Sequence, residues 1–104
     1  HENYKDKVIT ARDIDSEITG AGTGHPIRCL RNQMTREYVK MEQSGASFEE
    51  LEYLTLGSLR KAVMEGDVIN GSLMAGQIAG LVKKKQSSSE IIQEIMNQAL
   101  NLLG

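Results

Sequence analysis

The sequence predicts a mostly helical fold with one small β-hairpin, an α+β arrangement. Two observations support this class. Apolar residues recur at helical spacing near both ends and through the middle of the chain, whereas residues 14–31 alternate around a glycine-rich turn. The length of 104 residues, with 39% hydrophobic and 25% charged residues, suits one soluble unit without a further division into domains.

The hairpin is predicted from two alternating runs that flank "GAGTGHP". Ile14, Ser16 and Ile18 alternate before this turn, and Ile27 and Cys29 alternate after it. Pro26 cannot donate a ladder hydrogen bond, so it is expected at the start or the edge of a strand. Both sides of the turn therefore favour extended backbone.

Helices are predicted on either side of the hairpin. The spacing of Tyr4, Val8 and Ala11 predicts a short helix over residues 3–11. Met34, Tyr38 and Met41 share one face of a second helix, which Gly45 ends. Each of these helices would bury one apolar stripe.

Two further helices begin at capping boxes, Ser47 with Glu50 and Ser87 with Glu90. The first is expected to run to the stop at Gly66. Its predicted core face contains Leu51, Leu54, Leu59, Ala62 and Val63. The apolar stripe of the last helix contains Ile91, Ile92, Ile95, Ala99, Leu102 and Leu103.

The stretch "GDVINGSLMAGQIAGLV", residues 66–82, begins like a loop and ends like a helix with very small side chains. Gly76 and Gly80 would lie one turn apart on one row of that helix, and each glycine costs about 1 kcal/mol relative to alanine. Such a row lets another backbone or a flat ligand come close, with the Gln77 amide available to a ring edge. The alternative is tight helix packing with Gln77 bonded to backbone.

Composition and local motifs argue against several functions. A formal charge of -2 gives no case for nucleic-acid binding, and no apolar run is long enough for a membrane span. The single Cys29 is expected to be a small buried residue in a reducing, cytoplasmic setting. His1, His25 and Cys29 lack the spacing of a metal site, and His25 is interpreted as a polar turn residue.

No complete active site appears in these local patterns. No serine lies in a nucleophile elbow, and "GAGTGHP" lacks the spacing and the following helix of a phosphate loop. The chain begins at His1 and enters a helical pattern at once, as expected for a piece of something longer, or for a processed or engineered start.

The segments "HENYKDKVI", "GHPIRCLRNQMTREY" and "GSLRKAVMEGDVINGSLMAGQIAGLV" together resemble the C-terminal third of one flavoprotein family. It comprises the nitronate monooxygenases and the similar flavin-dependent enoyl-acyl carrier protein reductases. The resemblance implies an FMN-binding TIM barrel as the parent fold, with residues 14–66 forming most of an inserted substrate domain. Residues 71–104 would be the helices that return to the barrel. Ser72, Met74 and Gln77 would lie beside the flavin.

The resemblance also implies what the chain lacks. The catalytic histidine and the FMN phosphate loops of the family lie upstream of the matched part, so no catalytic residue is expected here and His25 does not take that role. The chain would be a C-terminal fragment of an FMN-dependent oxidoreductase, inactive alone, with the remainder of the barrel as its partner. NAD(P)H is a candidate electron donor, and the enoyl reductase type is slightly favoured over the monooxygenase type.

A second hypothesis comes from a different class of protein. The same helices could form a stand-alone interaction module in which the apolar surface makes a homo-oligomer or binds another partner. The oligomeric state discriminates between the two, since a clean monomer would argue against the interaction module.

Overall fold

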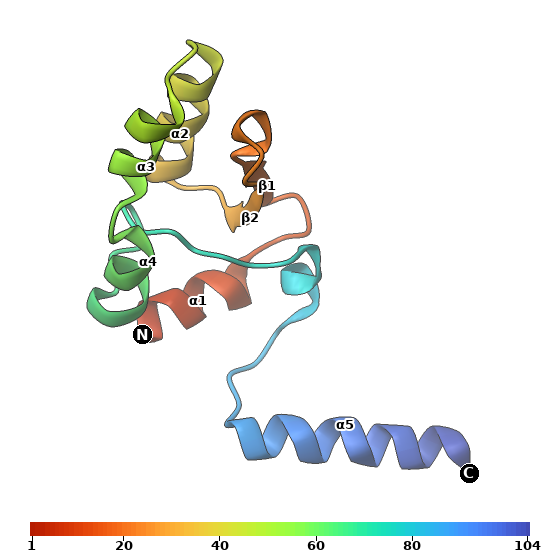
Figure 1. The fold of residues 1–104 in the computed structure, drawn as a ribbon. Helices are drawn as coiled ribbons and strands as arrows, with labels where there is room; N and C mark the ends of the chain where they lie inside the picture. Colours follow the sequence, from red (N-terminus) through yellow and green to blue (C-terminus); the bar gives the residue numbers. More distant parts are fainter.

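A single two-stranded sheet and a series of short helices make up the structure, a computed structural model that describes residues 1–104. The predicted fold class is confirmed (Figure 1). In chain order the elements are α1 Glu2–Thr10, β1 Ser16–Thr19, the 3-10 turn η1 Ala21–Thr23, β2 Ile27–Leu30, α2 Gln33–Gln43, α3 Phe48–Thr55, α4 Ser58–Arg60, the π-helical turn η2 Lys61–Glu65, the 3-10 turn η3 Gln77–Leu81 and α5 Ser88–Leu103.

The hairpin is antiparallel, with Ser16 opposite Leu30 and Thr19 opposite Ile27. Its turn depends on Gly20, which has a φ of 80°. A Cβ atom at this position would collide with the carbonyl oxygen of His25. The glycine-rich turn therefore closes the hairpin, and it does not open into a loop that could hold a phosphate.

The helices α2 and α3 pack against each other around Met34, Tyr38 and Leu51. Asn32 caps α2, because its side chain accepts from the backbone N–H of Thr35 while the Thr35 hydroxyl accepts from the N–H of Asn32. Sequence patterns did not indicate this reciprocal capping box, since Thr35 is not the Glu or Gln of the usual motif.

The single helix predicted from Ser47 to Gly66 is divided in two. Gly57 has a φ of 72°, a left-handed conformation that ends α3 and begins α4. The predicted core face holds for Leu51 and Ala62, which are fully buried. It is wrong for Leu59 and Val63, each 41% exposed, because the break at Gly57 turns the following helix to a different direction.

The predicted helix of small residues is also wrong in its first half. The chain is extended at Gly76, with φ -79° and ψ 172°, and only Gln77–Leu81 coil, as a 3-10 turn. Gly76 and Gly80 therefore do not share a helical row. A Cβ atom at Gly76 would meet nothing within 4 Å, whereas one at Gly80 would lie 2.7 Å from the backbone nitrogen of Asp13.

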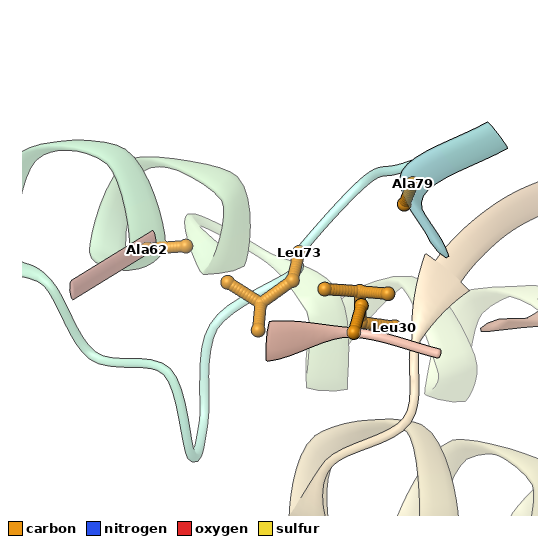
Figure 2. Close-up of a cluster of buried hydrophobic side chains, with 5 residues drawn as sticks. Leu30, Ala62, Leu73 and Ala79 are labelled. Carbon is orange, nitrogen blue, oxygen red and sulfur yellow. The ribbon is translucent and has the colours of Figure 1, made fainter. Parts of the chain in front are cut away.

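The main core lies where α1, β2, η2 and η3 meet. It consists of Ala11, Leu30, Ala62, Leu73 and Ala79, with Tyr4 and Val8 packed against it. Figure 2 shows Leu73 between Ala62 on one side and Leu30 and Ala79 on the other. The small alanines let these elements approach closely around Leu30 and Leu73.

The last helix, α5, stands apart from the rest of the chain at the end of an extended connection (Figure 1). Ion pairs from Lys85 to Glu2 and Asp6 tie that connection to α1. The apolar stripe of α5 remains uncovered, with Ile92 62% and Ile95 59% exposed. The radius of gyration is accordingly 16.3 Å, against about 13 Å for a compact domain of 100 residues. None of the helices is long and apolar enough to span a membrane.

Candidate functional site

An extended segment, Ser72–Ala75, forms the centre of the candidate site. It lies antiparallel to β2, where the N–H of Leu30 donates to the carbonyl of Leu73 at 2.8 Å. The N–H of Ala75 donates to the carbonyl of Arg28 at 3.3 Å, and Met74 forms a bridge opposite Cys29. Because side chains alternate along extended backbone, Leu73 enters the core while Ser72 and Met74 point to the other face.

Ser72 and Met74 open into a groove of about 340 Å³. The hairpin, α2, α3 and the start of α4 form its walls, and its apolar lining includes Ile27, Cys29 and Met34. Gln77, the third residue that the sequence suggested, does not line the groove and is exposed beyond it. The structure therefore brings two of the three residues together and leaves Gln77 at a distance along the chain.

The Ser72 side chain is held firmly in the groove wall. It is buried, and its hydroxyl oxygen lies 2.6 Å from that of Ser58, in a hydrogen bond where either can donate. The Ser72 N–H also donates to the carbonyl of Ser58 at 3.0 Å. Met74 is 41% exposed, and its carbonyl accepts a 2.6 Å hydrogen bond from the Tyr4 hydroxyl. This backbone is thus fixed on both sides before any ligand arrives.

An aromatic contact not anticipated from the sequence lies on the groove. The imidazole of His25 in the hairpin turn stacks on the ring of Phe48 at the start of α3, with centroids 4.8 Å apart and planes at 28°. Both residues line the groove. No local pattern could reveal this pair, because it joins a turn and a helix that are distant in sequence.

Burial favours the neutral forms of two ionisable side chains, Cys29 in the groove and Tyr4 next to it. Burial raises the pKa of the Cys29 thiol, and the charge of Glu17 raises it further. The pKa of the Tyr4 hydroxyl is also raised, first by burial and then by Cys29. The thiol therefore stays neutral at physiological pH, which confirms its interpretation as a small buried residue.

The groove contains no activated serine, and the chain contains no cluster of metal ligands. No three histidine, cysteine or carboxylate side chains lie close enough together to hold a metal ion. The hydroxyls of Ser58 and Ser72 bond to each other, and neither bonds to a histidine or a carboxylate that could activate it. The groove thus presents apolar side chains beside two paired hydroxyls, within a chain that leaves much apolar surface uncovered.

Comparisons with known proteins identify the larger class. The family model described as "Nitronate monooxygenase" matches residues 1–98. FabK from Thermotoga maritima has a similar structure, with a TM-score of 0.89 and 38% identity over 99% of this chain. A mutant of the same FabK matches with a TM-score of 0.74 and 36% identity over 94% of the chain.

The chain belongs to the nitronate monooxygenase family, whose members are FMN-dependent oxidoreductases built on a TIM barrel, and the predicted resemblance is confirmed. It covers 32% of the length of the first FabK chain and 28% of the second.

Proposed function

We propose that this chain forms one wall of the flavin site in an FMN-dependent oxidoreductase and acts only together with the rest of an FMN-binding barrel. The groove beneath Ser72 and Met74 is the observation that carries the proposal. These two positions come from the family resemblance, and their side chains share one face of a fixed extended segment. A chain of this length is well short of the roughly 250 residues that such a barrel needs.

The residues present fit the ring of FMN on one side. A flavin ring is flat, with apolar faces and polar edges. Met74 and Cys29 offer soft apolar atoms, and the Ser72 hydroxyl offers a polar contact. The backbone at Gly76 has no atom within 4 Å of its missing side chain, so a flat group can approach it. Gln77 is exposed just beyond, with its amide able to donate and accept.

The phosphate of FMN would need another part of the protein, because the glycine-rich turn of this chain is closed within the hairpin. When bound, the flavin would supply the hydride or the electrons for the reaction. Ser72, Met74 and Gln77 would position the ring and exclude water from it, and none of them would exchange a proton with substrate.

We favour the enoyl-acyl carrier protein reductase type over the nitronate monooxygenase type, with NAD(P)H as electron donor and the cytoplasm as the setting. The likeness to FabK supports the reductase type. A comparison of two assays tests it in the full-length protein that contains this chain. NAD(P)H oxidation driven by a 2-enoyl thioester would support the reductase, whereas oxygen consumption driven by an alkyl nitronate would contradict it.

The flavin placement is tested by Gly76→Leu. In this chain the new side chain meets open space at a φ of -79°, so the fold should remain intact. In the full-length protein the same side chain would occupy the face proposed for the flavin and abolish FMN binding, measured by quenching of flavin fluorescence. Gln43→Leu adds the same side chain at the exposed end of α2 and serves as the control. Normal FMN affinity in the Gly76→Leu protein would contradict the proposed position of the flavin.

A second candidate function is an interaction module that forms a homo-oligomer. The uncovered face of α5 favours it, since Ile91, Ile92, Ile95, Met96 and Leu100 are all exposed. Size-exclusion chromatography of the chain with light scattering distinguishes the two. A defined dimer would support the module, whereas a clean monomer would argue against it.

A further inference from the structure

A second hollow, of about 550 Å³, lies beside the end of α1. The start of α2 and the loop after η2 complete its walls, and it shares no lining residue with the groove. Alternation along extended backbone explains the separation. Leu30 and Leu73 line this cavity, whereas their neighbours Cys29, Ser72 and Met74 line the groove on the opposite face.

The charge of this cavity is opposite to that of the chain. Lys7, Arg12, Arg31 and Arg36 line it, against the one carboxylate of Asp15. The whole chain carries a formal charge of -2. Positive charge is therefore concentrated in this cavity. Such a cavity attracts anions more strongly than the same charges would if they were spread over a flat surface.

Two of the four cations are balanced within the chain. The guanidinium of Arg12 bonds both carboxylate oxygens of Asp15, at 2.9 and 3.3 Å. Arg31 pairs with Glu17 at 3.4 Å and also donates to the carbonyl of Ile14. No ion pair of the chain includes Lys7 or Arg36. The cavity thus keeps two uncompensated cations next to two fixed guanidinium groups.

We propose that this cavity binds the phosphate groups of a small organic phosphate. Guanidinium groups present planar donors that match phosphate oxygens, and a lysine adds a compact charge. The volume lies within the range of small-ligand sites, and its concave shape suits such a ligand better than the flat surface of an acidic protein. The proposal goes beyond the flavin site and does not depend on it.

The test titrates the isotopically labelled chain with sodium pyrophosphate at constant ionic strength and follows the backbone amide resonances. We expect saturable binding, with the changes gathered at Lys7, Arg12 and Arg36. Lys7→Ala and Arg36→Ala should each weaken binding about fivefold, since each removes one charge-assisted contact. Both side chains are exposed, so circular dichroism should show an unchanged fold in both variants. Lys40→Ala is the control, because it removes an exposed, unpaired charge of α2 outside the cavity.

Two outcomes would overturn the proposal. Resonances that shift linearly without saturation would show that the cavity has no specific affinity for phosphate. An equal weakening in Lys40→Ala would show that only net charge matters. Adenosine diphosphate serves as a second probe, which tells whether the cavity recognises a whole nucleotide or only its diphosphate group. Tighter binding than pyrophosphate identifies a nucleotide, and equal binding identifies the diphosphate group alone. Either result leaves the flavin proposal unaffected.

Discussion

The hydroxyl of Tyr4 donates a 2.6 Å hydrogen bond to the carbonyl oxygen of Met74, although the two residues are 70 positions apart in the sequence. The bond joins α1 directly to the extended segment that forms the wall of the groove. The same segment also pairs with β2, through the carbonyl of Leu73 and the N–H of Ala75 on either side of Met74. The position of Met74 therefore depends on the first helix as well as on the hairpin.

Removal of this hydroxyl should weaken the chain measurably. Tyr4→Phe keeps the ring but leaves the Met74 carbonyl without its donor, which should lower the free energy of unfolding by about 1 kcal/mol. Urea denaturation monitored by circular dichroism measures the change. Tyr53→Phe is the control, because Tyr53 is 82% exposed. Equal stabilities of the two variants would show that the Tyr4 bond contributes nothing.

The two glycines of the 76–80 segment should respond in opposite ways to alanine. Gly80→Ala places a Cβ atom 2.7 Å from the backbone nitrogen of Asp13, and backbone cannot move aside cheaply. A loss of about 1–3 kcal/mol is expected from this overpacking. Gly76→Ala meets open space at a negative φ, so it should be neutral or add about 0.4–1 kcal/mol by restricting the unfolded chain.

Thermal unfolding of the two variants side by side makes this comparison. A destabilised Gly76→Ala together with a neutral Gly80→Ala would contradict the close approach at Gly80. Similar losses in both variants would instead favour the helical row that the sequence alone suggested, because that row puts both glycines against the same partner.

Local signals in the sequence were sufficient for most of the elements. The hairpin follows from alternation around a turn, and α3 and α5 begin at Ser47 and Ser87, whose hydroxyls accept from the N–H groups of Glu50 and Glu90. These signals act within one helical turn. They predict where an element begins, because the capping bond forms between residues close in sequence.

Long-range pairing explains why the predicted helix of small residues is wrong in its first half. The alanine and leucine of the 72–76 stretch favour helix, but backbone bonds to Arg28 and Leu30 hold it extended. Part of the candidate site was nonetheless predictable, since the family resemblance selected Ser72 and Met74. The stack of His25 on Phe48 and the basic cavity depend on segments that only the folded chain brings together.

The paired hydroxyls of Ser58 and Ser72 should behave as one unit. Ser72→Ala leaves the buried Ser58 hydroxyl without its 2.6 Å partner, at a cost of about 1–3 kcal/mol. The double variant Ser58→Ala/Ser72→Ala removes both polar groups, so it should cost less than the sum of the single changes. Chemical denaturation of the four proteins completes the cycle. Strictly additive losses would show that the two hydroxyls do not interact.

Cys29 should make the chain less stable in alkaline solution. Burial raises the pKa of its thiol, so above the ordinary thiol pKa of about 8.5 the unfolded chain loses this proton before the folded chain does. Stability is therefore complete below about pH 8.5 and declines as the pH rises towards the folded pKa. Between pH 7.5 and pH 9.5 the free energy of unfolding, measured by denaturation, should decline more in the wild type than in Cys29→Ala. A smaller decline remains in Cys29→Ala, because the raised pKa of Tyr4 also makes stability depend on alkaline pH. Identical declines in the two proteins would mean that the thiol titrates as freely in the folded chain as in the unfolded one.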